Sequence, residues 1–400
     1  MQIDAVLCLG NMLRLLFLHV LFIKLFYHPL KGSFLVIKGE KAIILKFKNW
    51  KMRIGLIRRE YITHLDGVNR FIALLYEAFE RLGRECVILS WGFYGMEKRE
   101  LPEWFKEIHG LELEPKILTL NDKPTVENPW IRIGWDWYNK GSKLVRKLDL
   151  DAVILNGIIP LRFSPIIAVN HGIQTLKSNR FYNFIAKSLY KRVDCIVSVS
   201  NKLATELRDW GIEVKKVISL PMKLPKVHIS DFTKRENIVV HVGVGDRKNP
   251  WVSVKTVEIL REKLNLKLVI TGGRLDIKRD FVEVVGKLSL KEYVELLSRA
   301  KALVLPSSYE AFPYAALEAM ACGTPVVVSN AIPDEVVVSG FNGIRVNSLE
   351  PMEWAKALEN VVTNEELWLK LSRNGLDFAK RFDYLEIARE YINLIREIEA

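Results

Sequence analysis

The sequence predicts an α/β protein built from two doubly wound domains in tandem. Its 400 residues exceed what one hydrophobic core usually serves. From residue 52 onward, short apolar runs alternate with segments of helical periodicity, which is the pattern of parallel sheets covered on both faces. A charged stretch with two prolines interrupts this alternation at 221–236 and indicates a linker. We therefore expect one domain at 52–220 and a second at 237–380.

The first domain is predicted from five buried strands and three helices. The strands are expected at 53–57, 86–89, 152–157, 166–172 and 195–200, and the helices at 68–82, 181–192 and 201–210. Between them, residues 91–143 are predicted to be irregular, with five tryptophans and several prolines. Two interpretations of this stretch stay open, acceptor binding and aromatic packing, and the second is favoured.

The second domain repeats the pattern. Its strands are expected at 237–243, 266–273, 281–286, 302–307 and 325–329. A last helix, at 384–398 within the segment 381–400, follows well after the final strand. Ligands of such sheets bind outside the carboxyl ends of the strands, so the cleft between the two domains is the expected active site.

Composition narrows the function classes. The chain is 49% apolar and 26% charged, which is typical of a folded globular protein. Its four cysteines are scattered without a CxxC pair, which argues against a zinc site or a disulfide framework and fits a reducing cytoplasm. The net charge is +12, but the basic residues are not interleaved with aromatic ones as in a stacking platform. Nucleic acid is therefore not an expected partner.

Residues 1–51 form a basic leader. They hold seven Lys and one Arg against one Asp and one Glu, which leaves a net charge of +6. The apolar run at 15–23 is shorter than the roughly 20 residues that a spanning helix needs, and no small-residue cleavage site follows it. Two short strands are expected within 33–47. The leader is either an amphipathic anchor at the inner membrane surface or an extension ahead of a natural start at Met52, and the second is favoured.

The sharpest motif is the sequence PSSYEAFPYAALEAMACGTP at 306–325. It predicts a strand end, a loop that carries Glu310, and a short helix opened by Pro313 and closed by Gly323. Free amides at such a helix start hold phosphates, which makes the start of this helix the predicted diphosphate site; its residues are Ala311, Phe312, Pro313, Tyr314 and Ala315. Glu318 follows about a turn and a half into the helix, so the two carboxylates are expected roughly 10 Å apart.

This motif is similar to the E-x7-E signature of the family 4 retaining glycosyltransferases, which have the two-domain, Rossmann-like GT-B fold. The resemblance implies that Glu310 contacts the donor sugar and that Glu318 holds the ribose hydroxyls. It also implies that the anomeric configuration is retained and that the terminal helix crosses back to the first domain.

A second donor segment is predicted at 241–250, HVGVGDRKNP. The family uses an Arg and a Lys here to neutralise the leaving diphosphate, and such charge stabilisation is the main catalytic need of an anionic leaving group. Lys248 matches the family lysine, but the arginine would fall near Val244, so Arg247 is the candidate substitute. Gly243 and Gly273, at the ends of two predicted strands, are further donor-binding candidates.

The first domain contributes His171, within the sequence NHG at 170–172. It resembles the family histidine that approaches the donor sugar from across the cleft. The loop at 58–67 keeps only Gly67 of the family's glycine-rich turn, so it is expected to shape the path of the acceptor instead. The triplet DLD at 149–151 resembles a metal-binding DxD motif of other glycosyltransferases but precedes a predicted strand, which favours surface charge. No metal is expected at the site, because Lys248 and the helix amides supply the positive charge.

The sequence therefore predicts a retaining, metal-independent hexosyltransferase of carbohydrate biosynthesis. The donor is a UDP- or GDP-linked sugar, which is a substrate and not a cofactor, and the acceptor is a glycan, a lipid-linked glycan or a small polar molecule. Peripheral membrane contact follows from the anchor interpretation of residues 1–51. Two alternatives stay open: a nucleotide-sugar epimerase of the same fold, and a noncatalytic scaffold that binds sugar nucleotides or a membrane surface.

Overall fold

The computed structural model describes residues 23–28, 33–38, 41–46, 51–64, 66–123, 130–172, 180–225, 231–310 and 312–399. Residues 1–52 and 53–400 form two separate compact units. In the first unit three antiparallel strands form one sheet in the order β1-β2-β3; they are Ile23–His28, Ser33–Lys38 and Lys41–Lys46. The two strands expected within 33–47 are present, whereas most of the apolar run at 15–23 lies outside the described residues. Among the helices that the structure describes, none has the length and apolar character to span a bilayer.

The second unit begins with a seven-stranded parallel sheet in the order β10-β9-β8-β7-β4-β5-β6. Its strands are β4 Arg53–Tyr61, β5 Glu85–Gly92, β6 Ile117–Thr119, β7 Ala152–Asn156, β8 Ile166–Asn170, β9 Cys195–Ser198 and β10 Lys216–Val217. The first strand in the chain, β4, lies in the middle, between β5 and β7. The chain therefore reverses its direction across the sheet at β4, which creates a switch point where ligands of doubly wound folds bind.

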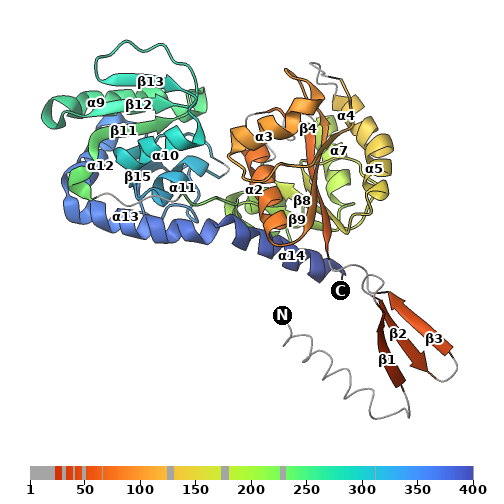
Figure 1. Cartoon of the computed structure of the whole chain (residues 1–400). Coiled ribbons are helices and arrows are strands. Elements are labelled where there is room, and N and C mark those ends of the chain that lie inside the picture. The colour runs from red at the N-terminus through yellow and green to blue at the C-terminus, as the bar shows by residue number, and fades with distance from the viewer. Residues whose placement is uncertain are drawn as a thin grey trace. The chain divides into compact units, whose positions relative to one another are not determined.

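Helices cover both faces of this sheet (Figure 1). They are α2 Gly67–Arg81, α3 Leu101–His109, α4 Trp130–Asp136, α5 Ser142–Lys147, α7 Arg180–Tyr190 and α8 Asn201–Asp209, with a 3-10 turn η1 Lys98–Glu100 and a π-helical turn η2 Trp137–Gly141. Helix α2 follows directly on β4 and packs on β4 and β5. Asp66 caps it, because its carboxylate accepts a hydrogen bond from the amide of Asn69 (2.9 Å).

The prediction that 91–143 is irregular is wrong, since this stretch forms α3, β6, α4, η2 and α5. Its tryptophans explain both the error and the structure. Trp91 and Trp137 are fully buried, and their indole N–H groups donate to Asp136 Oδ2 (2.9 Å) and to the carbonyl of Arg59 (2.8 Å). Large amphipathic rings in short helices obscure the helical period, and each needs a partner for its N–H group. These two rings serve packing, which was the favoured interpretation.

The second domain contains a six-stranded parallel sheet in the order β13-β12-β11-β14-β15-β16. Its strands are β11 Glu236–Val242, β12 Lys267–Thr271, β13 Val282–Gly286, β14 Ala300–Leu305, β15 Val326–Ser329 and β16 Ile344–Val346. The first strand, β11, lies between β12 and β14, so this sheet has its own switch point. All five strands expected for this domain are present, and β16 adds a sixth.

Helices α9 and α12 cover one face of the second sheet, and α10 and α11 cover the other (Figure 1). The helices of this part are α9 Pro250–Leu264, α10 Leu290–Arg299, α11 Tyr314–Ala321, α12 Pro351–Thr363, α13 Glu365–Ala379 and α14 Tyr384–Glu399, with 3-10 turns η3 Phe232–Lys234, η4 Asp246–Lys248 and η5 Lys380–Phe382. Together the two sheets confirm the predicted fold class of two doubly wound α/β domains.

The chain crosses between the domains twice. The amide of Met222 donates to the carbonyl of Phe382 (2.7 Å), and the amide of Tyr384 donates to the carbonyl of Met222 (3.0 Å). The outgoing and returning segments therefore lie side by side. Beyond this point α14 packs on α2 of the first domain (Figure 1), as a crossover helix does.

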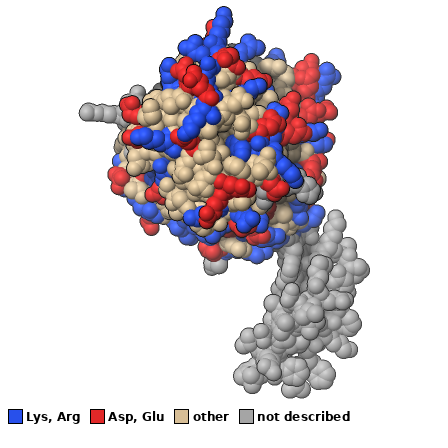
Figure 2. Space-filling view, turned by 90° about the vertical axis from the view of Figure 1, so that its left-hand side faces the viewer, with Lys and Arg blue, Asp and Glu red and all other residues tan. Residues whose placement is uncertain are grey.

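The surface of the second domain carries mixed charge. Figure 2 views the molecule from the side that carries α9 in Figure 1, and blue and red residues are interspersed there. On α9, Lys255 pairs with Glu258 and Lys263 pairs with Glu359. On this face, therefore, acidic neighbours locally balance part of the positive charge.

A buried cation in the second domain joins the ends of two helices to the start of β11. Arg235 is 4% exposed, and its guanidinium donates to the carbonyls of Leu297 (3.0 Å) and Cys322 (2.8 Å) and to Thr324 Oγ1 (2.9 Å). Burial lowers the pKa of Arg235 to about 10. Because Leu297 lies in the last turn of α10 and Cys322 and Thr324 follow α11, the guanidinium fixes both helix ends to the start of β11.

Replacing Arg235 with Met should lower the free energy of unfolding by about 3 kcal/mol, because buried carbonyls lose their donors. Unfolding in urea, followed by circular dichroism on the full chain, measures the loss. The control is Lys234→Met, since the Lys234 side chain is 73% exposed and its ion pair is with exposed Asp231. Equal stability of the two variants would contradict the role assigned to Arg235.

Candidate functional site

A cleft of ≈ 540 Å³ lies between the two domains of residues 53–400. One wall comes from the start of α2 and the end of α3 in the first domain. The other wall comes from the carboxyl ends of β11 and β12, the loop after β14 and the start of α11. The cleft thus opens at the switch point of the second sheet, where the topology predicts a ligand.

The start of α11 is open toward this cleft. Pro313 occupies the N-cap position with extended backbone, provides no side-chain cap, and is followed by no acidic residue in the first turn. The first amides of a helix have no partners within it, so an uncapped start is ready to bind an anion. Of the predicted diphosphate-binding residues, Phe312, Pro313, Tyr314 and Ala315 line the cleft, and Ala311 lies outside the described residues.

Glu310 lies in the loop before this helix and pairs with Lys248. Its carboxylate also accepts a hydrogen bond from the hydroxyl of Ser307 (2.8 Å). Gly243 makes this pair possible: it adopts φ +99°, and a Cβ there would lie 2.8 Å from Lys248 Cγ. A side chain at position 243 would therefore push Lys248 away from Glu310.

Two hydrogen bonds join the loops that carry this pair. The side-chain amide of Asn249 donates to the carbonyl of Pro306 (2.8 Å), and the amide of Ser308 donates to the carbonyl of Arg247 (2.8 Å). Arg247 thus contributes its backbone, while the residue itself is exposed and does not line the cleft. Gly273 does not line the cleft either, although its neighbour Gly272 does. A Cβ on Gly273 would clash with the Val244 side chain.

Glu318 lies on the cleft face of α11 and is 7% exposed. It pairs with Arg70, which comes from α2 of the first domain. Burial disfavours the charge of Arg70, but the Glu318 carboxylate together with the nearby Tyr314 and Tyr293 outweighs this effect, so the pKa of Arg70 is raised. Sequence reasoning missed Arg70, because only the tertiary fold brings α2 to α11. The one local signal was Gly67, which begins α2 at the cleft wall.

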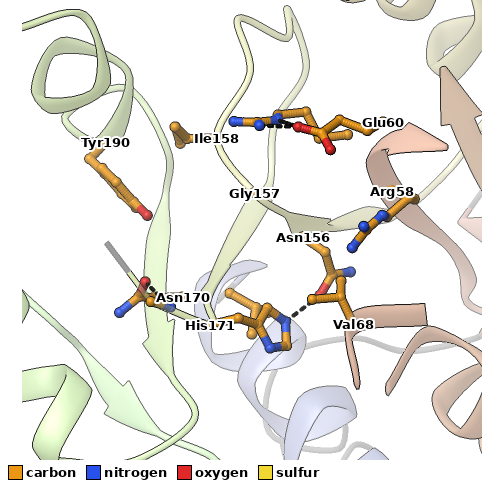
Figure 3. Close-up of a pocket in the computed structure, with 12 residues that line it drawn as sticks. Arg58, Glu60, Val68, Asn156, Gly157, Ile158, Asn170, His171 and Tyr190 are labelled. Carbon is orange, nitrogen blue, oxygen red and sulfur yellow. Dashed lines mark hydrogen bonds and ion pairs between the residues drawn. The ribbon is translucent and has the colours of Figure 1, made fainter. Parts of the chain in front are cut away.

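His171 lies elsewhere. It lines a second cavity of ≈ 180 Å³ in the first domain, at the carboxyl ends of β4, β7 and β8 (Figure 3). Asn156 Nδ2 donates to the carbonyl of Ile57 (3.3 Å), which leaves Asn156 Oδ1 to accept from His171 Nε2 (2.8 Å). Burial, assisted by the charge of Arg58, lowers the pKa of His171 to about 3, so the ring is neutral at pH 7. A Cβ on the next residue, Gly172, would lie 3.9 Å from Tyr309 Oη of the second domain.

The end of β4 forms another side of this first-domain cavity; the prediction of a loop from residue 58 is wrong, because β4 continues to Tyr61. Arg58 donates to Asp66 Oδ2 (2.7 Å), and Arg59 pairs with Glu60 (Figure 3). The expectation that residues 58–67 shape the path of the acceptor stays a prediction, and of these residues Arg58, Arg59 and Glu60 line the cavity from the end of β4.

The DLD triplet lies at the opposite end of the sheet. Asp151 Oδ2 accepts from the amide of Arg53 (2.8 Å), and Asp149 pairs with the Arg53 guanidinium (3.3 Å). Both carboxylates thus hold the amino ends of β7 and β4, away from the cleft. Within the described part of the chain, no group of three or more His, Cys, Asp or Glu side chains is arranged to hold a metal ion.

Comparison with known proteins agrees with this architecture. The model of Glycosyltransferase Family 4 matches residues 65–221, and that of Glycosyl transferases group 1 matches residues 226–378. An uncharacterized glycosyltransferase of Methanocaldococcus jannaschii is 32% identical over 46% of this chain and 58% of its own length. The O-antigen chain mannosyltransferase RfbU of Salmonella typhimurium is 28% identical over 51% of this chain and 60% of its own length. The chain thus spans a little over half the length of these two relatives.

Solved structures match over most of the chain. Sucrose-phosphate synthase of Thermosynechococcus elongatus has a TM-score of 0.69 at 17% identity, over 87% of this chain and 99% of its own. HepE of Anabaena, solved in complex with UDP-glucose, has a TM-score of 0.66 at 17% identity, over 86% of this chain and 100% of its own. These likenesses show the GT-B fold. Since the two family models together cover more than half of the chain, the protein belongs to the group 1, family 4 glycosyltransferases.

Proposed function

We propose that this protein is a retaining glycosyltransferase that transfers a hexosyl group from a UDP- or GDP-linked sugar to an acceptor held by its first domain. One observation carries the proposal: Glu310 and Glu318 lie before and within α11, and both line the cleft onto which the uncapped start of this helix opens. Anion-binding amides between two carboxylates match a nucleotide diphosphate sugar, which has hydroxyl groups at both ends and negative charge in the middle.

In this arrangement the diphosphate lies at the start of α11, near Lys248. Glu310 accepts hydrogen bonds from the sugar hydroxyls, and Glu318 accepts them from the ribose. HepE was solved with UDP-glucose, and RfbU is named a mannosyltransferase, so both names agree with a hexosyl donor. Lys248 pairs with Glu310 in the donor-free protein, so its charge is already positioned beside the site of the leaving group.

The reaction breaks the bond between the anomeric carbon and the diphosphate and forms a bond from that carbon to an acceptor oxygen. Negative charge grows on the departing phosphate, where Lys248 and the amides of α11 stabilise it without a metal ion. Retention, with attack from the face that the diphosphate leaves, is proposed from the family resemblance. Neutral His171 supplies an N–H group to Asn156 on the first-domain side and is the proposed contact to the donor sugar once the cleft is occupied.

The acceptor site is proposed at the first-domain cavity of Figure 3, which holds a glycan, a lipid-linked glycan or a small polar acceptor. The cavity carries charged and amide groups, so hydroxyl-rich molecules suit it. Cys86, Cys195 and Cys322 are free and buried, which favours action in the reducing cytoplasm.

Replacing Glu310 or Lys248 with Ala should each lower kcat/KM for sugar transfer by about 10²–10³, the loss expected for one electrostatic contact at a reacting charge. Release of nucleoside diphosphate from a labelled donor measures the rate. Lys255→Ala on α9 is the matched control, because Lys255 is an exposed lysine paired only with Glu258. Transfer at the unmodified rate in both site variants would refute the assignment.

Removal of divalent metal ions by a chelator should leave the rate of sugar transfer unchanged, because the positive charge at the diphosphate comes from the protein. Rates measured with excess EDTA and with added Mg²⁺ or Mn²⁺ are expected to agree within about twofold. Loss of activity in EDTA with recovery on adding one of these ions would show that a metal takes part.

A panel of nucleotide sugars separates the alternative functions. A transferase yields an acceptor whose mass has grown by one hexosyl group, together with free nucleoside diphosphate. A nucleotide-sugar epimerase changes its substrate without any acceptor, and a scaffold binds the nucleotide without turnover. Mass spectrometry of the products therefore identifies the transferase. Chromatography that resolves epimers, which have equal mass, separates the epimerase from the scaffold.

A further inference from the structure

Arg70 crosses from the first domain to the start of α11. It lies one turn into α2, its guanidinium pairs with Glu318, and its guanidinium carbon lies 4.9 Å from the centroid of the Tyr314 ring. Tyr314 and Glu318 are four residues apart on one helix, so they share the face that lines the cleft. The Arg70 side chain is 27% exposed and that of Glu318 is 9% exposed. The guanidinium therefore lies beside the helix start where the diphosphate is proposed to bind.

The charge balance of the cleft shows why a diphosphate needs this cation. The acidic residues that line it are Asp66, Glu310 and Glu318, and the basic ones are Arg70, Lys248 and Lys287. His109 also lines the cleft, but burial and then the charge of Arg70 lower its pKa to about 4, so it adds no positive charge at pH 7. Asp66 is already compensated by Arg58, so without Arg70 the two lysines would only balance Glu310 and Glu318, and the cleft would hold no net positive charge to attract a dianion.

The second donor segment supplies only one cation to this cleft. Its Lys248 pairs with Glu310, and Val244 packs toward Gly273 at the position where the family has an arginine. Arg247 is exposed and does not line the cleft. Among the residues that the structure describes, Arg70 is thus the one arginine that lines the cleft.

We propose that Arg70 is the second cation that binds the donor diphosphate, supplied by the first domain in place of an arginine near position 244. The inference rests on the proposed function. A guanidinium has five N–H donors in a planar fork, so Arg70 keeps donors for phosphate oxygens while it bonds to Glu318. The Glu318 carboxylate retains lone pairs for ribose hydroxyls, and it holds Arg70 in position for the phosphates.

The test compares a nucleoside with its diphosphate, because the two share base and ribose and differ in the charged group. Binding constants for uridine and UDP, and for guanosine and GDP, are measured on the full chain by competition or calorimetry. In Arg70→Gln the ratio of the nucleoside Kd to the diphosphate Kd should fall roughly 10-fold or more, and Arg70→Lys should restore part of it. A purely structural role through Glu318 would weaken both ligands equally and leave the ratio unchanged. Arg81→Gln, on the same helix but outside the cleft, should leave the ratio as it is.

Arg70→Gln leaves Glu318 without its partner, so the double variant Arg70→Gln with Glu318→Gln provides a second comparison against Glu318→Gln alone. The ratio of the nucleoside Kd to the diphosphate Kd should also be lower in the double variant than in Glu318→Gln alone. An unchanged ratio in both comparisons, or a fall in Arg247→Gln instead, overturns the role of Arg70 while the proposed function stands. If the unmodified protein binds neither UDP nor GDP, both the proposed function and this inference are overturned.

Discussion

The neutralisation of two largely buried carboxylates is the interaction on which this site depends. Glu310 and Glu318 both face the cleft, and an unpaired buried carboxylate costs several kcal/mol. Lys248 of the second domain compensates the first, and Arg70 of the first domain compensates the second. The two ion pairs therefore fix the loop after β14 and the approach of α2 to α11 before any ligand binds.

Topology brings these groups together. In each sheet the first strand lies in the middle, so the loops after β4 and β7, and those after β11 and β14, emerge side by side. In the second domain, hydrogen bonds from Asn249 to Pro306 and from Ser308 to Arg247 join the paired loops. In the first domain the same position holds the cavity with His171 (Figure 3). The proposed donor site and the proposed acceptor site thus occupy equivalent positions in the two domains.

The sequence predicts best what is encoded locally. Buried parallel strands are continuous apolar runs, which is why most strands were found within a few residues. Glu310 and Lys248 follow such runs directly, and both line the cleft. The short helices of 91–143 were missed because their rings point into a core that no local pattern reveals. Arg70 was missed for a related reason, since its partner belongs to the other domain and only the packed structure joins them.

The sequence departs from the family pattern at the glycine-rich turn of 58–67 and at the arginine expected near Val244. These two departures have a common physical basis. The segment 58–67 keeps only Gly67, and Arg58 at the end of β4 bonds to Asp66, whose carboxylate also caps α2. That cap makes Gly67 the first residue of the helix, and a Cβ on Gly67 would lie only 3.6 Å from the Tyr314 ring. With the start of α2 this close to α11, the residue one turn later reaches Glu318. Because α2 is capped and lies against α11, its Arg70 can thus carry the positive charge that the loop after β11 lacks.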